Sequence, residues 1–378
     1  MIGLVDAFSL CYAEARVKFL EAAATAGLQI ESYNHPLLGK DGEALAMDTA
    51  LQLPASGKPS EQLLILSSAC HGVEGYCGSG VQVFALHDEE WLAKSRAQNV
   101  MVLYIHALNP YGFSHIRRTT HENVDLNRNF HDYLKPLPIN MAYREVAEML
   151  MPPSWPPSAA NMAQLKAYLD KNGEFAFQSA VSGGQHEYAE GLFFGGTEAT
   201  WSNKTLRKVL SKHNAGVKKV GWIDFHTGLG PNGLGERIFA CKEDAAALQR
   251  ARAWWGGVQH ADGTFETPIT SFYDGSSSSA KLTGLMWSSA YDAFPSAEYT
   301  AIAMEYGTQP PLQINMAMRA ENWLHHNPKH PDATPALAKK IKQDMLDAFY
   351  TDTDAWKGQI ISQARQSMFQ AVDGLNPS

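Results

Sequence analysis

Short, uninterrupted apolar runs recur along the chain. The runs QLLILSS at 62–68 and NVMVLYI at 99–105 show no alternation of polar and apolar residues, which is typical of parallel strands buried on both faces. Four further segments have strand-like patterns, at 28–33, 44–53, 218–225 and 300–304. The pattern therefore predicts a sheet whose central strands are covered on both sides.

Helical spacing of apolar residues occupies much of the chain between these runs. It predicts helices at 12–26, 79–91, 245–255, 315–325 and 335–350. Gly27 is a suitable stop for the first helix, and Thr334 followed by Pro335 is a suitable start for the last.

Strands that alternate with helices predict an α/β fold with a mixed, mainly parallel, twisted sheet flanked by helices. We expect one domain over residues 1–378, with a lobe inserted at about 131–215 and a helical C-terminal segment at about 311–372. The Pro-rich stretch 151–157 indicates a boundary or an exposed loop within that lobe.

Composition narrows the classes of function. Of the 378 residues, 45% are hydrophobic and 19% are charged, which is enough apolar material for a large core. The net charge is −8 and no cluster of Lys and Arg is present, so we expect no binding of nucleic acid. No apolar run is long enough for a membrane span, and the four cysteines form no disulfide pattern. Because the N-terminus also lacks a secretory signal, a cytoplasmic location is predicted.

Chemically capable side chains follow four of the predicted strands at the point where each strand ends. They are His71, Asn109, His226 and Glu305. Because binding sites of parallel sheets form beyond the carboxyl ends of the strands, we expect these residues to share one active site.

Two histidines and a glutamate in this set match the needs of a catalytic zinc ion. His71 and Glu74 are three residues apart, and His226 supplies a third ligand from another strand. Three protein ligands leave a fourth position open for water, and we expect one zinc ion per chain, although the donor set also admits Fe, Co, Mn or Ni. Cys70 and Cys77 are interpreted as small buried packing residues and not as ligands.

The order of several short motifs resembles that of the zinc carboxypeptidases. These motifs are HGVE at 71–74, NPYGF at 109–113, NVDLNRNF at 123–130, DFH at 224–226 and EYG at 305–307. The resemblance covers roughly residues 60–310, apart from the insertion at about 131–215. The His-Gly-x-Glu form looks closer to the aspartoacylase and succinylglutamate desuccinylase branch, and to bacterial peptidoglycan-peptide amidases, than to digestive carboxypeptidases. A carboxypeptidase-like, phosphorylase/hydrolase-like fold is the implied architecture.

The resemblance also implies a role for each matched residue. Asp125 would hydrogen-bond a metal-bound histidine, and Arg118 would polarise the scissile carbonyl. Asn127 and Arg128 would bind the terminal carboxylate of the substrate, and Glu305 would act as the general base.

Several of these assignments have alternatives. Arg117 could exchange roles with Arg118. His106 and His121 are possible substrate contacts. The tyrosine that digestive carboxypeptidases carry on a mobile loop has three candidates, which are Tyr273, Tyr291 and Tyr299. The Gly- and aromatic-rich segment 191–196 is a candidate lid or substrate wall, or else an ordinary packed loop.

These residues favour a zinc-dependent hydrolase that cleaves an amide bond next to a free carboxylate. One form is a carboxypeptidase-like metallopeptidase acting on a small peptide, and the other is a deacylase acting on an N-acyl amino acid. A non-catalytic, metal-dependent peptide-binding protein is a third hypothesis, which Glu305 disfavours because a binding protein needs no general base.

Overall fold

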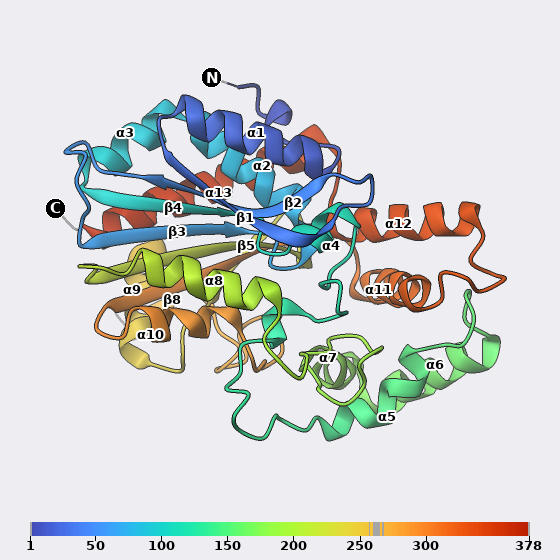
Figure 1. The fold of residues 1–378 in the computed structure, drawn as a ribbon. Coiled ribbons are helices and arrows are strands. Elements are labelled where there is room, and N and C mark those ends of the chain that lie inside the picture. The colour runs from blue at the N-terminus through green and yellow to red at the C-terminus, as the bar shows by residue number, and fades with distance from the viewer. Residues whose placement is uncertain (1, 257, 260–264, 267, 377–378) are drawn as a thin grey trace.

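A mixed sheet of eight strands forms the centre of the computed structural model, which describes residues 2–256, 258–259, 265–266 and 268–376 (Figure 1). The strand order is β1-β2-β4-β3-β5-β10-β6-β9. The strands are β1 (Gln29–Leu38), β2 (Ala44–Gln52), β3 (Gln62–Ser68), β4 (Val100–His106), β5 (Lys219–Asn232), β6 (Gly235–Phe239), β9 (Ile269–Thr270) and β10 (Glu298–Gly307). The neighbours β4, β3, β5 and β10 run parallel, whereas β1, β2 and β6 join antiparallel. The predicted α/β class with a mixed, mainly parallel sheet is confirmed.

Helices cover both faces of this sheet. On one side pack α1 (Tyr12–Thr25), α2 (Gly75–His87), α3 (Glu89–Ala97) and α13 (Asp354–Leu375). On the other side lie α8 (Trp201–Lys212) and α10 (Ser289–Ala293) (Figure 1). The chain also forms α9 (Ala245–Trp255) and a separate two-stranded sheet of β7 (Val258–Gln259) and β8 (Phe265–Glu266).

A second group of helices lies beside the carboxyl ends of the parallel strands (Figure 1). It contains α5 (Met141–Leu150), α6 (Ala159–Asn172), α7 (Glu174–Ser182), α11 (Pro311–His326) and α12 (Pro335–Phe349). Side chains of these helices form a hydrophobic cluster distinct from the main core under the sheet. The assignment of a single domain with an inserted lobe stays a prediction. No helix among the described residues is long and apolar enough to cross a membrane, and the cytoplasmic location stays a prediction too.

Most predicted elements agree with the structure, but one helix is wrong. In place of a single helix over 79–91, α2 begins at Gly75 and the chain breaks at Asp88, whose carboxylate accepts a hydrogen bond from Trp91 N and so starts α3. Nearly every residue of α2 is buried, so the helix has no polar face to reveal its period. The elements β6, β9 and α8 were not predicted.

His106 lies in the core and not at a substrate site. Its ring stacks on Phe19 at a centroid distance of 4.6 Å, and Nε2 lies 2.8 Å from Ser79 Oγ. Burial lowers the pKa of His106 to about 4, against the opposing charge of Asp48. Folding therefore holds this imidazole neutral at pH values where it would be protonated in the unfolded chain.

Replacing His106 with glutamine should make the free energy of unfolding less dependent on pH below about 6.5. The pKa of His106 in the folded protein lies below its value of about 6.5 in the unfolded chain. The stability that the neutral imidazole contributes is therefore complete above pH 6.5 and is lost as the pH falls towards 4. Between pH 6.5 and pH 4, the free energy of unfolding should decrease by about 3 kcal/mol more in the wild type than in His106→Gln. Urea titrations at pH 7, 6, 5 and 4 measure this, with His330→Gln as a control on a less buried histidine. An unchanged slope in His106→Gln would refute the interpretation.

Candidate metal centre and active site

His71 and Glu74 lie in a tight turn between β3 and α2. The turn is a single 3-10 turn over Gly72–Glu74. Its backbone is fixed by hydrogen bonds from Gly72 N to Arg118 O and from Val73 N to Arg117 O, at 3.0 and 2.8 Å. Position 72 must be glycine, because a Cβ there would lie 2.1 Å from the backbone of Gly112.

The sheet register brings His226 and Glu305 to the same edge as this turn. On β5, His226 is the register partner of Glu305 on β10. One strand further, Ser68 at the end of β3 is paired with Phe225. Because the three strands are parallel, their carboxyl ends coincide, and the predicted meeting of His71, Glu74 and His226 is realised in a buried cluster that could hold a metal ion.

The donor atoms of this cluster have the spacing of metal ligands. His71 Nδ1 lies 2.8 Å from Glu74 Oε1, His226 Nδ1 lies 2.9 Å from Glu74 Oε2, and the two Nδ1 atoms are 3.3 Å apart. Tetrahedral ligands with bonds of about 2.0–2.1 Å are about 3.3 Å apart. The nitrogen and oxygen donors therefore fit a divalent ion such as zinc.

Two buried aspartates contact the opposite nitrogens of these imidazoles. Asp125 Oδ1 lies 3.2 Å from His71 Nε2, and Asp224 Oδ2 makes a very short hydrogen bond with His226 Nε2. With the proton on each Nε2, both Nδ1 lone pairs are directed at Glu74. Burial alone would raise the pKa of Asp125, but Arg118, Arg128 and His71 hold it well below its usual range.

The contact of Asp224 with His226 was not predicted from the sequence. The other oxygen of Asp224 accepts a 2.5 Å hydrogen bond from Ser67 Oγ, which in turn accepts from Trp222 Nε1 at 2.7 Å. The spacing Asp224-x-His226 on a predicted strand was an available signal, because residues two apart share a face.

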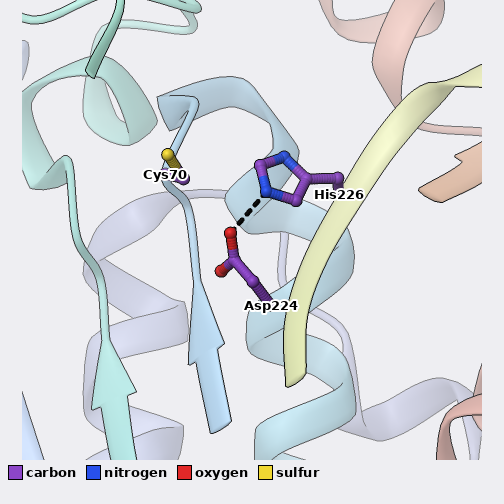
Figure 2. Close-up of side chains that lie close together, drawn as sticks. All are labelled: Cys70, Asp224 and His226. Carbon is purple, nitrogen blue, oxygen red and sulfur yellow. Dashed lines mark hydrogen bonds and ion pairs between the residues drawn. The ribbon is translucent and has the colours of Figure 1, made fainter. Parts of the chain in front are cut away.

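Cys70 lies beside this pair, as Figure 2 shows for Cys70, Asp224 and His226. The direct hydrogen bond between Asp224 and His226 leaves no room for an ion between them. Burial and the neighbouring carboxylates raise the pKa of the Cys70 thiol well above its usual value, which favours the uncharged thiol over a thiolate ligand. Cys70 and Cys77 are fully buried.

Glu305 lies in the same cavity with its carboxylate free on one side. Its Oε1 accepts a 3.1 Å hydrogen bond from Leu229 N. Burial, together with the negative charge of Glu74, raises the pKa of Glu305 to about 8.

Arg118 contacts the metal-ligand cluster directly. Its Nε lies 3.0 Å from Asp125 Oδ2, Nη1 lies 3.3 Å from Glu74 Oε1, and Nη2 lies 2.8 Å from His71 Nε2. His71 Nε2 cannot both donate a hydrogen bond to Asp125 and accept one from Arg118. When Nε2 carries the proton, Arg118 Nη2 is therefore available to another acceptor. Arg117 lies outside the cavity wall and pairs with Glu321 at 3.3 Å.

Asn127 and Arg128 lie on the cavity wall together. Asn127 Oδ1 accepts from Met286 N at 2.9 Å, which leaves the amide nitrogen for a ligand. Arg128 donates through Nε and Nη2 to Ser182 O, at 2.9 and 2.7 Å, and through Nη1 to Asn127 O at 2.8 Å. A guanidinium has five N–H groups, so two remain after these contacts.

Phe193, from the segment 191–196, lines the cavity next to these arginines. The Arg118 and Arg128 guanidinium carbons lie 4.9 and 5.5 Å from the centroid of its ring. Such cation–π contacts orient both guanidinium planes without consuming their N–H groups. Phe193 is therefore part of the cavity wall.

The cavity has a volume of about 590 Å³, within the range of about 300–1,000 Å³ that is common for ligand pockets. His71, Glu74, His226, Arg118, Asn127, Arg128 and Glu305 all line it. Among the described residues, its lining includes no tyrosine, and neither His106 nor His121. Tyr273 OH instead lies 3.1 Å from Cys241 O, and Tyr291 OH accepts from Lys242 N. The side chain of Tyr299 is buried in the main core.

Three solved structures align with most of the chain at low identity. Carboxypeptidase A from Helicoverpa armigera is 12% identical over 89% of this chain and 73% of its own, with a TM-score of 0.41. A metallo-carboxypeptidase from Pseudomonas aeruginosa is 13% identical over 88% and 66%, with a TM-score of 0.38. Bovine thrombin-activatable fibrinolysis inhibitor is 11% identical over 95% and 97%, with a TM-score of 0.42.

No curated protein matches the chain. A family model described as a protein of unknown function, DUF2817, matches residues 8–363 and so includes every element that lines the cavity. On the extent of this match, the chain belongs to the DUF2817 family.

Proposed function

We propose that the protein is a zinc-dependent hydrolase that cleaves an amide bond next to a free carboxylate. The observation that carries the proposal is the convergence of three metal-donor residues, a carboxylate of raised pKa and two arginines on one cavity. His71, Glu74 and His226 would hold the ion. A bound zinc ion supplies Lewis acidity and lowers the pKa of water towards about 7.

Glu305 is the proposed general base. Its carboxylate would take a proton from the attacking water and give that proton to the leaving amine. The hydrogen bond from Leu229 N holds one carboxylate oxygen, which leaves the other to face the cavity.

Arg118 is the proposed donor to the scissile carbonyl. A fixed cation stabilises the negative charge that develops on this oxygen during attack. The contacts of Arg118 with Asp125 and Phe193 keep the guanidinium oriented before the substrate arrives.

Asn127 and Arg128 are the proposed clamp for the substrate carboxylate. The free amide nitrogen of Asn127 and the two remaining N–H groups of Arg128 would donate to its oxygens. The same clamp serves the C-terminus of a peptide or the carboxylate of an N-acyl amino acid, so a carboxypeptidase-like activity is our first proposal and a deacylase our second.

Replacement of Glu305 by glutamine should reduce kcat by about 10²–10⁴-fold without loss of the ion, because the amide cannot accept the proton and Glu305 is not a proposed ligand. Assays on short peptides and N-acyl amino acids, with zinc content measured by mass spectrometry, test this. Wild-type turnover in Glu305→Gln would disprove the assignment. Ligand binding without turnover in either protein would instead favour the binding-protein hypothesis.

Replacement of Asp224 by asparagine should weaken zinc binding by about 10–100-fold, because the Nε2–H of His226 loses its charged acceptor. Competition with a chromophoric chelator measures the affinity. Asp48→Asn is the matched control, since Asp48 is equally buried but pairs with Arg16. Equal zinc affinities for the wild type and Asp224→Asn would contradict the supporting role.

Replacement of Arg128 by lysine should weaken the preference for a substrate with a carboxylate over the same substrate with a carboxamide. The ratio of the two kcat/KM values should fall by about 10–100-fold, mainly through KM, because a lysine cannot make the two-pronged contact. The two substrate forms are compared in wild type, Arg128→Lys and Arg207→Lys. Arg207 also stacks on a phenylalanine, Phe130, but lies outside the cavity wall. An unchanged preference in Arg128→Lys would exclude Arg128 from the clamp.

A further inference from the structure

The cavity lies between two separate hydrophobic clusters. On one side, Ile238, Phe272 and Trp287 belong to the main core. On the other side is a surface that we call the lobe wall, made of side chains from α7 and α11. Its residues are Phe175, Phe177, Val181, Leu312, Ile314 and Met318.

The lobe wall includes two large apolar side chains that are exposed to solvent. Phe175 is 69% exposed and Leu312 is 53% exposed, whereas Phe177 and Ile314 are buried in the second hydrophobic cluster. Exposed apolar side chains that continue a buried apolar wall mark a surface suited to an apolar ligand group.

Positive charge is scarce in the cavity. Among the described lining residues, the only Lys or Arg side chains are Arg118 and Arg128. Arg118 already pairs with Asp125 and Glu74, which leaves Arg128 as the principal partner for one substrate carboxylate. A second carboxylate on the substrate would have no cation, and Glu174 at the start of α7 would repel it.

The exposed Phe175 of the lobe wall and the carboxylate clamp lie at different ends of α7. Arg128 binds the carbonyl of Ser182, the last residue of α7, whereas Phe175 is in its first turn. Seven residues of helix separate them by about 10 Å. A substrate held by its carboxylate at Arg128 therefore reaches Phe175 only with a group that extends well beyond the clamp.

Resting on the proposed function, we infer that the substrate carries a single carboxylate on its leaving side and an uncharged, bulky apolar group on its acyl side, and that this group binds the lobe wall. The apolar group can be a fatty acyl chain or the side chain of an apolar penultimate residue. Substrates with acidic acyl groups, such as succinyl, are disfavoured.

Binding measurements on the zinc-loaded Glu305→Gln protein test the inference without turnover. The probes are N-acetyl-, N-butyryl-, N-hexanoyl-, N-octanoyl- and N-succinyl-leucine, titrated by calorimetry. We expect Kd to fall roughly threefold for each added CH₂ that the wall covers. Succinyl and butyryl have the same number of carbons, and we expect the succinyl compound to bind at least tenfold more weakly. A succinyl compound that binds as well as the butyryl one overturns the inference, and a flat series excludes acyl chains as the source of the apolar group.

A second arm distinguishes the two sources of the apolar group. N-acetyl-Phe-Leu is compared with N-acetyl-Gly-Leu in the same titration. If only the phenylalanine peptide binds more tightly than its glycine counterpart, the lobe wall binds peptide side chains. If only the acyl series shows a Kd that falls with chain length, the lobe wall binds acyl chains. No gain in either arm refutes the proposal.

Variants of the lobe wall locate the effect. In Leu312→Asp and in Phe175→Ser, each made in the Glu305→Gln protein, the ratio of the acetyl to the octanoyl Kd should fall at least fivefold. Both residues are exposed, and an aspartate in the first turn of α11 suits the helix N-terminus, so the fold should persist. Leu134→Asp, at a side chain 97% exposed and outside the cavity, is the matched control. Ratios unchanged in both wall variants would exclude the lobe wall.

Turnover by the wild-type protein, measured in parallel, separates this inference from the proposed function. If Kd falls with acyl length but no probe is hydrolysed, the lobe wall is confirmed as the site of the apolar group and the proposed hydrolase function is refuted. Turnover with no dependence on the acyl group keeps the hydrolase and removes the inference.

Discussion

Hydrogen-bond acceptors that face one another set the main constraint on this structure. The Nδ1 atoms of His71 and His226 and both oxygens of Glu74 lie 2.8–3.3 Å apart, and with protons on the two Nε2 atoms none of them has a hydrogen to share. Lone pairs at such distances repel unless a cation lies between them. Asp125 and Asp224 favour a proton on Nε2 of each imidazole, and in that tautomer a bound cation would relieve the repulsion between the facing lone pairs.

The cavity also depends on how the second helical group is attached to the sheet. Arg128 donates twice to Ser182 O at the C-terminal end of α7, where the unpaired helix carbonyls concentrate negative charge. Its ring partner, Phe193, contacts Arg118 as well. Arg128 therefore couples the position of α7, and with it the lobe wall, to Arg118 beside His71 and Glu74.

The sequence pattern predicted those parts of the fold in which burial leaves a local signature. Gln62–Ser68 was predicted to the residue, because a strand covered on both faces is a continuous apolar run. The helix α2 was misplaced because it is buried on all sides. The proximity of His71, His226 and Glu305 was predicted from their positions at the ends of strands, because the carboxyl ends of neighbouring parallel strands lie at the same edge of the sheet. The lobe wall was beyond prediction, because α7 and α11 line the same cavity although 128 residues of sequence separate them, and no local pattern fixes their relative position.

Charge balance links the ion to the proposed base. Four carboxylates, those of Glu74, Asp125, Asp224 and Glu305, lie near two guanidinium groups, those of Arg118 and Arg128, which leaves two negative charges when all are ionised and the histidines are neutral. Desolvation, together with the negative charge of Glu74, raises the pKa of Glu305 to about 8. A divalent cation matches the excess in magnitude. An ion held by His71, Glu74 and His226 would offset the charge of Glu74 and so lower the pKa of Glu305, which would favour the carboxylate form that accepts a proton.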